Sequence, residues 1–425
     1  DCLPVDKDCN PLRPAILYGI DSRAEEEIKW LTQYYGDGVN KMFGHPICTG
    51  DTATKILWLK NHEPEVYEKT YKFLTGSSYL KLTGKYVIDQ FLAKGSFRPL
   101  YNRDGTINKE NCSLYCRPDQ IAECAYSFEI AGTVTEEAAK ESGLKKGTPV
   151  IVGTGDSTAE AISVGLVESG TVFFQYGSSM FYYYCVDRYV DDYVSANGNG
   201  SLKGGKEFTI PGTFCIGDGT NAAGTLTRWV RDTFYEEELK KERAGGENAY
   251  AVMAREAAEV EAGSEGLIIL PYIYGERSPI QDAKASGMLF GLKGTHTRKQ
   301  INRAALEAVG YSTLQHMILF DEMNLPPKSV ITAGGGTKNA AWMQIICDMI
   351  GRQICIPKRY QCSAYGDAAM AALGDRRFRD FTELRDSLPK GKILVPNEKN
   401  HIYYKEHYKM FRDLYLNNKD MMHRI

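Results

Sequence analysis

The stretch from Val150 to Ser179 constrains the fold of this chain more than any other segment. Its first residues, Val150 to Val152, have side chains of the strand type, and the glycine-rich run 153–155 then predicts a sharp turn. Small residues between 157 and 163 suit a closely packed helix, and Gly170 reverses the chain into a second apolar run. We therefore expect a strand, a helix and a second strand, joined by glycine turns.

This segment also carries two features suited to one kind of chemistry. Asp156 follows the first turn, and the second strand ends at Gly177 and Ser178, where backbone N–H groups could face an anion. One carboxylate and one anion-binding turn on adjacent elements fit phosphoryl transfer, in which a base orients the attacking hydroxyl. A purely structural interpretation stays open. In that case Asp156 caps a helix that begins at Ser157, and Gly177 only ends a strand.

A second glycine turn occurs late in the chain. The apolar run 330–333 leads directly into Gly334, Gly335 and Gly336, and a helix is expected from Asn339 to Ile350. Glycines allow a ligand to approach the backbone, and the N-terminus of a helix favours phosphate groups. The pattern matches neither G-x-G-x-x-G nor G-x-x-x-x-G-K-[ST], so it supports neither a dinucleotide fold nor a P-loop. Taken alone, the glycine pattern could equally well be a simple tight turn. Together with Asp156 and the turn at Gly177, it predicts a nucleotide site.

Length and charge narrow the class of protein. A chain of 425 residues is long enough for two or three domains, and we expect a boundary near residues 147–149. The net charge of -3 provides no general attraction to nucleic acid or to anionic membranes. The sequence contains no run of 18 apolar residues and no apolar signal-peptide core near its start. We therefore expect neither a nucleic-acid partner nor a membrane partner.

The cysteines predict a reducing compartment. Eleven cysteines, an odd number scattered along the chain, favour free thiols in the cytoplasm over a disulfide framework. Cys112, Cys116 and Cys124 form the one cluster, but no fourth ligand with suitable spacing follows them. We interpret these three as structural thiols.

Local patterns outside these segments predict further elements. We expect a buried strand from Ala15 to Tyr18, a helix from Ala24 to Tyr35, and a helix from Pro118 to Ala125. A helix after Gly219 should bury Leu226, Trp229 and Val230 on one side.

Several segments, in their order along the chain, resemble one family. They are PLRPAILYGIDSR, TATKILWLKNHEPEVY, PVIVGTGDSTAEAISVG, LPYIYGERSPIQD followed by GMLFGL, and ITAGGGTKNAAWMQIICDMIG. Together they resemble the FGGY carbohydrate kinases, most closely the xylulokinase-like branch, along nearly the whole chain.

The resemblance implies an α/β fold with two domains of the ribonuclease-H/actin type and a cleft between them. Each domain would be a mixed five-stranded sheet with helices on both faces. We expect residues 1–148 to form the sugar-binding N-terminal domain and residues 149–425 the ATP-binding C-terminal domain. In the family, a strand, a D-x-G-T-x-S phosphate loop and a hairpin come before the segment matched here. We therefore expect the first domain to lack its N-terminal strands in this chain.

The resemblance also implies an activity and a set of site residues. The chain is expected to transfer the γ-phosphate of ATP, with Mg²⁺, to a terminal hydroxyl of a ketose or polyol such as D-xylulose or a related pentulose. Asp156 would be the catalytic base and a metal ligand. The nucleotide would contact Gly177, Ser178, Gly224, Arg228, Gly335, Gly336 and Asn339, and the sugar would contact Asp21, Arg23, Gln90 and Asp156. We expect a cytoplasmic enzyme and allow for a homodimer.

Alternatives remain for individual residues and for the activity. Arg23 could instead form an ion pair with Asp21 or Asp89 inside its domain. Asp156 is followed by Ser157, where xylulokinases usually carry Asn and glycerol kinases Gln, which weakens the assignment of D-xylulose. A non-catalytic sugar- or nucleotide-binding relative, or an actin-like ATPase, would use a similar cleft. The GERSP and GMLFGL segments favour the kinase, since actin-like ATPases lack both.

Overall fold

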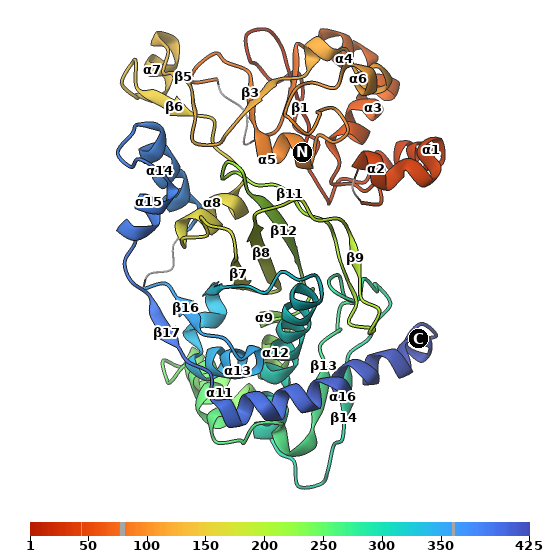
Figure 1. Cartoon of the computed structure of the whole chain (residues 1–425), viewed down its shortest axis with the longest axis vertical. Coiled ribbons are helices and arrows are strands. Elements are labelled where there is room, and N and C mark those ends of the chain that lie inside the picture. Colours follow the sequence, from red (N-terminus) through yellow and green to blue (C-terminus); the bar gives the residue numbers. More distant parts are fainter. Residues whose placement is uncertain (44, 77–80, 359–361) are drawn as a thin grey trace.

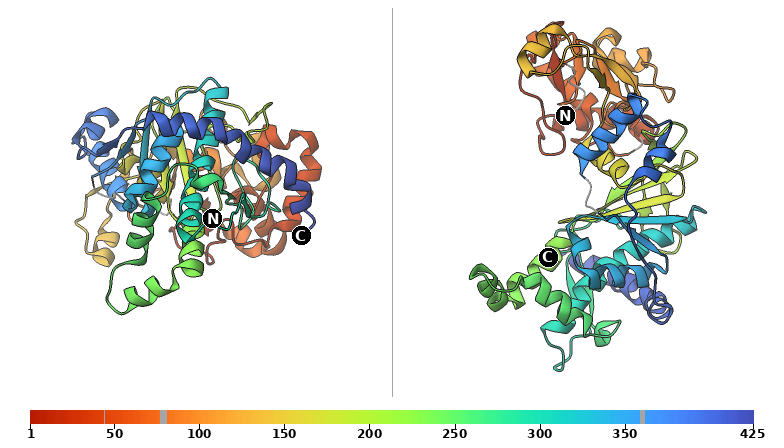
Figure 2. Two further views of the ribbon diagram at one scale, coloured as in Figure 1. Left: turned by 90° about the horizontal axis from the view of Figure 1, so that it is seen from below. Right: turned by 90° about the vertical axis from the view of Figure 1, so that its left-hand side faces the viewer.

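The chain forms two lobes joined near its middle. The computed structural model describes residues 1–43, 45–76, 81–358 and 362–425. In Figure 1 the N-terminal part of the chain, up to about residue 151, forms the upper lobe, and the rest of the chain, from yellow-olive through green to blue, forms the lower one. The right-hand view of Figure 2 shows the same two lobes one above the other. The upper lobe is the first along the chain, and we call them the first and second lobes.

A seven-stranded sheet is the centre of the second lobe, and its order is β11-β12-β8-β7-β15-β16-β17. Its central strands β12, β8 and β7 pair antiparallel, whereas β7, β15 and β16 pair parallel. These five form the mixed sheet that was expected, and β11 and β17 each add one antiparallel strand at an edge. The strands are β7 (Thr171–Tyr176), β8 (Met180–Val186), β11 (Lys206–Glu207), β12 (Phe214–Gly219), β15 (Ser329–Ala333), β16 (Ile354–Ile356) and β17 (Lys392–Leu394).

Both faces of this sheet are buried, because alternate side chains of β7 enter different cores. Phe174 and Tyr176 pack in the core that contains helices α12 and α13, whereas Phe173 packs in the core that contains α8 and α14. A strand with a period of two and apolar residues on both faces must be covered on both sides. The continuous apolar run 172–174 is therefore a consequence of this position, and the predicted strand is confirmed.

The remaining elements of the second lobe surround the sheet. They are α8 (Asp156–Ser163), α9 (Gly224–Phe234), α10 (Glu236–Arg243), α11 (Ala249–Ala258), α12 (Arg298–Glu322), α13 (Ala340–Ile350), α14 (Ser363–Gly374), α15 (Phe381–Ser387), α16 (Glu398–Met422), and the strand pairs β9 (Tyr193–Val194) with β10 (Ser201–Leu202) and β13 (Ile268–Leu270) with β14 (Met288–Phe290). No helix in the described part of the chain has both the length and the apolar character of a membrane span.

The first lobe contains short strands that pair only two by two. The pairs are β1 (Leu3–Val5) with β2 (Lys72–Leu74), β3 (Val87–Asp89) with β4 (Glu123–Ala125), and β5 (Ile130–Thr133) with β6 (Pro149–Ile151). The expected five-stranded sheet is therefore not formed by the described residues of this lobe. Helices supply most of its core, because Leu31, Ile56 and Tyr115 pack with the β1–β2 pair in one cluster. Its helices are α1 (Glu25–Tyr35), α2 (Val39–Phe43), α3 (Thr52–His62), α4 (Pro64–Lys69), α5 (Gln90–Gly95), α6 (Lys109–Tyr115) and α7 (Glu136–Ser142).

Two predicted elements of the first lobe are wrong. The strand from Ala15 to Tyr18 reduces to one bridge between Ile16 and Cys2, and Tyr18 is 70% exposed. The chain turns just after it, at Gly19 with a φ of 72°, so no further residue can pair. The helix expected over 118–125 ends after Gln120, and β4 then pairs with β3. The helix expected over 24–35 is confirmed as α1.

The apolar side of α9 is narrower than predicted. Leu226 and Val230 are buried, but Trp229 is 39% exposed and lies edge-on to Phe234. Residues 226 and 230 are about one helical turn apart and lie on the same side of the helix. Residue 229, the neighbour of 230 in sequence, lies on a different side. The tertiary contact therefore covers only part of the apolar stripe.

Helix α14 lies directly against α8 with no side chain between their backbones. A Cβ atom at Gly366 would overlap the carbonyl oxygen of Ala159 in α8. Because Asp156 begins α8, this contact helps to fix the position of that carboxylate.

We therefore expect Gly366→Ala to lower the free energy of unfolding by about 1–3 kcal/mol, the usual effect of forcing a methyl group into a packed contact. The control is Gly294→Ala, since a Cβ at this exposed glycine meets no atom within 4 Å. Its effect should stay within about 0.5 kcal/mol in urea-induced unfolding. Equal stability of the two variants would show that the helices do not touch as described.

Candidate functional site

One cavity of about 490 Å³ in the second lobe gathers the residues predicted to bind a nucleotide. It lies where the end of β7, the start of α9, the helices α11 and α12, and the glycine turn before α13 come together. Its lining includes Gly177, Ser178, Gly224, Arg228, Gly335, Gly336 and Asn339. Residues from three separate segments thus meet at one place.

The turn after β7 is joined to the N-terminus of α9 by backbone contacts. Gly224 donates its N–H to the Gly177 carbonyl, and Thr225 donates to that of Ser178, both at 3.0 Å. A Cβ atom at Gly224 would lie 2.5 Å from the Gly177 oxygen, so only glycine fits there. The turn and the positive end of a helix dipole are therefore held side by side, which suits an anion.

Arg228 adds a full positive charge to this end of the cavity. Arg228 lies about one helical turn after Gly224, the first residue of α9, and it is exposed. Among the described residues, no carboxylate forms an ion pair with it. A guanidinium without a protein partner can form charge-assisted hydrogen bonds to phosphate oxygens.

The three glycines after β15 differ in what surrounds them. Gly334 has a φ of 95°, and a Cβ atom there would lie 2.6 Å from the Tyr176 oxygen. At Gly336 a Cβ would lie 2.9 Å from the Trp342 ring, whereas at Gly335 it would meet nothing within 4 Å. Gly335 thus borders open space, and its neighbours are packed. Asn339 caps α13, because its Oδ1 accepts the N–H of Trp342 at 3.0 Å.

The opposite wall of the cavity was not predicted from the sequence. It consists of Tyr250, Ala251 and Ala254 from α11 together with Leu306 from α12. The small residues three positions apart were the only local signal, because Ala251 and Ala254 leave room on one side of the helix. The remaining pattern of α11 is that of an ordinary amphipathic helix.

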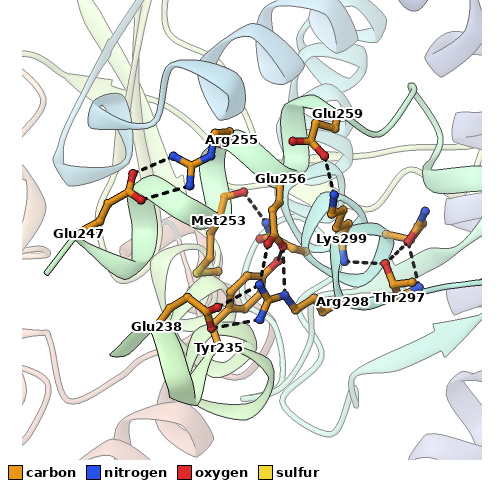
Figure 3. Close-up of polar contacts among 12 residues, drawn as sticks. Tyr235, Glu238, Glu247, Met253, Arg255, Glu256, Glu259, Thr297, Arg298 and Lys299 are labelled. Carbon is orange, nitrogen blue, oxygen red and sulfur yellow. Dashed lines mark hydrogen bonds and ion pairs between the residues drawn. The ribbon is translucent and has the colours of Figure 1, made fainter. Parts of the chain in front are cut away.

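A group of ion pairs behind this wall holds three helices together (Figure 3). Arg298 of α12 donates to Glu238 of α10 at 3.0 Å and to Glu256 of α11 at 2.6 Å. Glu256 also accepts the hydroxyl of Tyr235 at 2.7 Å. The guanidinium of Arg298 holds the pKa of Glu238 below its usual value, so the pair is charged at neutral pH. These contacts give the cavity a fixed wall.

Asp156 is the first residue of α8, and its side chain is exposed. Gly155 occupies the N-cap position, so Asp156 does not cap this helix from outside; its Oδ1 accepts the N–H of the next residue, Ser157, at 2.8 Å. A second carboxyl lies nearby. Burial, and next the negative charge of Asp156, raise the pKa of Asp367, the residue after Gly366 in α14.

The hairpin of β7 and β8 holds α8 in place. The hydroxyl of Ser157 lies 3.0 Å from that of Tyr183 in β8, and Gln175 in β7 donates to both oxygens of Glu160 at 2.9 Å. The same hairpin ends in the turn at Gly177. The candidate base and the candidate phosphate turn are therefore attached to one rigid element.

The predicted sugar residues have partners in their own lobe. Arg23 donates to both carboxylate oxygens of Asp21 at 2.8 Å, so the alternative of an ion pair with Asp21 is realised. This pairing lowers the pKa of Asp21. Gln90 is buried, and its Oε1 accepts the ammonium group of Lys94 at 2.8 Å. In the described part of the chain, no hydrogen bond joins any of the three to Asp156.

Asp89, the other proposed partner of Arg23, lies elsewhere. It is buried, and its Oδ2 accepts a hydrogen bond from the hydroxyl of Thr154 at 2.6 Å. This bond links the first lobe to the turn before Asp156. Burial raises the pKa of Asp89 to about 7.

The GERSP segment supports the side of the site that was predicted to bind the nucleotide. Glu276 is buried, which raises its pKa to about 7, and its Oε1 accepts the N–H groups of Asn221 at 2.6 Å and Arg277 at 2.8 Å. Arg277 in turn donates from Nε to the Oδ1 of Asn221 at 2.9 Å. The segment thus positions the turn that leads into Gly224 and α9.

Two family models match the chain. Residues 1–163 match the N-terminal domain of the FGGY family of carbohydrate kinases, and residues 177–374 match its C-terminal domain.

Individual relatives are similar along most of the chain. The xylulose kinase of Staphylococcus epidermidis (strain ATCC 12228) is 28% identical over 419 residues, which cover 98% of this chain and 80% of the relative. The gluconokinase of Bacillus subtilis is 26% identical and covers 91% of this chain and 74% of the relative. The crystal structure of xylulose kinase from Rhodospirillum rubrum superposes with a TM-score of 0.85 at 26% identity, over 99% of this chain and 83% of that one.

The open space at Gly335 leads to a prediction about the cavity. Gly335→Val should fold normally but raise the KM for ATP, because its side chain would enter the space that the nucleotide needs, while sugar binding measured by calorimetry should not change. The comparison is Gly336→Val, whose side chain would clash with Trp342 and should lower the melting temperature. Equal loss of both ligands in Gly335→Val would point to misfolding and contradict this reading.

Proposed function

The chain belongs to the FGGY family of carbohydrate kinases, and on this premise we propose that it phosphorylates D-xylulose or a related pentulose. As a member of that family it is an ATP-dependent sugar kinase. The choice of sugar is supported by the similarity to the xylulose kinases of Staphylococcus epidermidis and Rhodospirillum rubrum. Ser157, which follows Asp156, is the residue that argues against D-xylulose itself as the substrate.

The observation that carries the proposal for ATP is the single cavity into which the separate glycine turns open. The phosphates would lie against Gly177, Ser178 and Gly224, with Arg228 contributing charge. The adenosine part would lie between the wall formed by α11 and the turn from Gly335 to Asn339. Such a site positions the transferring group and offsets its charge, which is the main contribution a protein makes to phosphoryl transfer.

On the acceptor side, Asp156 is proposed as the general base. Its carboxylate would accept the proton of the terminal hydroxyl as that oxygen bonds to the γ-phosphorus, and the bond from phosphorus to the β-phosphate oxygen would break to release ADP. The carboxyl of Asp367, which interacts electrostatically with Asp156, is an oxygen ligand of the kind that Mg²⁺ prefers. We propose that these two carboxylates help to hold Mg²⁺, which when bound offsets charge between the phosphates.

Further parts of the proposal concern organisation. We propose residues 1–148 and 149–425 as the two domains, although β6 after this boundary pairs with β5 before it. Asp21, Arg23 and Gln90 are proposed to face the sugar from the first domain when the lobes approach. A cytoplasmic location is supported by eleven cysteines that are all unpaired and all within the described residues. Assembly into a homodimer stays a prediction.

The base is tested by Asp156→Asn. Removal of a general base typically costs about 100- to 10,000-fold, so kcat for sugar phosphorylation should fall by that amount while ATP affinity, measured by calorimetry, stays near that of the wild type. Asp420→Asn, at an exposed position on α16, is the matched control and should keep full activity. Retention of more than about a tenth of kcat by Asp156→Asn would rule out this role.

The acceptor is tested by ADP release with a panel of D-xylulose, other pentuloses, glycerol and gluconate. The highest kcat/KM should be found with D-xylulose or another pentulose. A preference for gluconate would replace this assignment and agree with the similarity to the Bacillus subtilis gluconokinase. Hydrolysis of ATP without any sugar would favour an ATPase, and no turnover would favour a binding protein.

A further inference from the structure

Three side chains with metal-binding atoms gather in the loop between α2 and α3 of the first lobe. They are His45, Cys48 and Asp51, and one ligand atom from each lies within 4.8 Å of the other two. We propose that they bind one Zn²⁺ ion or a similar divalent transition-metal ion. Nitrogen, sulfur and carboxylate oxygen are the ligands that such ions prefer, whereas Mg²⁺ prefers oxygen alone. This site is therefore separate from the metal of the kinase reaction.

The orientation of His45 supports a cation between its ring and Asp51. Its Nδ1 donates to the Pro46 carbonyl at 2.8 Å, so in the neutral ring Nε2 carries a lone pair. That Nε2 faces Oδ1 of Asp51 at 3.4 Å. Two acceptors in this arrangement need a proton or a metal ion between them. A backbone carbonyl that accepts from the distal ring nitrogen is also the usual support of a metal-binding histidine.

The distance between these two atoms fits one metal better than one hydrogen bond. A charge-assisted N–H···O bond is usually about 2.7–2.9 Å long. Two ligands bonded at about 2.0–2.1 Å to a tetrahedral Zn²⁺ are separated by about 3.3–3.4 Å. The separation of 3.4 Å between Nε2 and Oδ1 matches the edge of that tetrahedron.

Asp51 is held as a metal-binding carboxylate would be. Its side chain is buried, with the residue 1% exposed, and Oδ2 accepts the backbone N–H of Cys48 at 2.8 Å. One oxygen is thus fixed by the protein, and the other faces His45. The same hydrogen bond fixes the backbone of Cys48 beside this carboxylate, and the Cys48 side chain is exposed.

The surrounding charges define the conditions for binding. Although burial opposes it, the carboxylate of Asp51 raises the pKa of His45. Partial burial and then the same carboxylate raise the pKa of the Cys48 thiol. The positive charge of Lys203 opposes the rise in the pKa of both His45 and Cys48. Lys55 interacts electrostatically with Cys48 and Asp51. Because a cysteine binds such metal ions as its thiolate, binding at Cys48 would release the thiol proton.

The site opens into a cavity of about 560 Å³ between the lobes, which His45, Cys48 and Asp51 all line. Its other wall comes from the second lobe and includes Tyr189 and Lys206. Three protein ligands leave one position of a tetrahedral ion for water or another small ligand, which is the arrangement of an open zinc site. The inference does not depend on the proposed sugar.

The test is a titration of the whole chain with Co²⁺, which replaces Zn²⁺ and reports its ligands by absorption. We expect one Co²⁺ per chain and a thiolate-to-metal charge-transfer band in the near ultraviolet. Cys48→Ser should abolish the band and weaken binding by at least about tenfold, since even loss of an indirect partner costs that much. The control Cys362→Ser, at another exposed cysteine in the second lobe, should change neither.

Two further measurements complete the test. His45→Gln should keep the band but weaken binding, and calorimetry in buffers of different ionisation enthalpy should show release of about one proton per metal, with affinity that rises with pH. Excess Mg²⁺ should not displace Co²⁺. A missing band, equal effects of Cys48→Ser and Cys362→Ser, or displacement by Mg²⁺ would each overturn the proposal.

Discussion

The candidate site depends on places where two backbone segments approach so closely that no side chain fits between them. At Gly224 a Cβ atom would lie 2.5 Å from the Gly177 carbonyl, and at Gly334 it would lie 2.6 Å from the Tyr176 carbonyl. Both contacts are made to the end of β7. Glycine is required because it alone lets two main chains approach in this way. The end of β7 therefore joins the N-terminus of α9 to the turn before α13, and these three segments form one side of the cavity proposed for the nucleotide.

The hairpin of β7 and β8 also connects the helices that border the cavity to the helices that carry the candidate catalytic carboxylates. One face of the sheet packs on α12 and α13, which border the cavity, and the other packs on α8 and α14, which carry Asp156 and Asp367. A strand buried on both faces is a stiff support, since movement on either side would open a packed core. We infer that this hairpin keeps the candidate phosphate turn and the candidate base in a constant relation to each other.

Charged groups around the site fall into two kinds. Arg298, Glu238 and Glu256 satisfy one another and stabilise a wall, whereas Arg228 faces the cavity without a carboxylate partner among the described residues. An unpaired cation in a cavity keeps its full attraction for an anionic ligand, because no protein group has offset its charge. In the first lobe, Asp21 and Arg23 satisfy each other, so a sugar would have to compete with that pair.

The sequence alone determined the features that depend on local conformation. The strand before Gly177, the helix after Gly155 and the glycine turn after β15 could each be predicted, because turns and amphipathic periods are encoded by neighbouring residues. The order of five longer sequence segments also identified the family, which the matched domains confirm. What the tertiary structure decided depends on residues far apart in the chain. The exposure of Trp229, the pairing of 123–125 as a strand and the α11 wall of the cavity result from packing against distant elements, which override local propensity. The short spacing of His45, Cys48 and Asp51 does not by itself show that their ligand atoms lie within 4.8 Å of one another, because the conformation of the loop decides this.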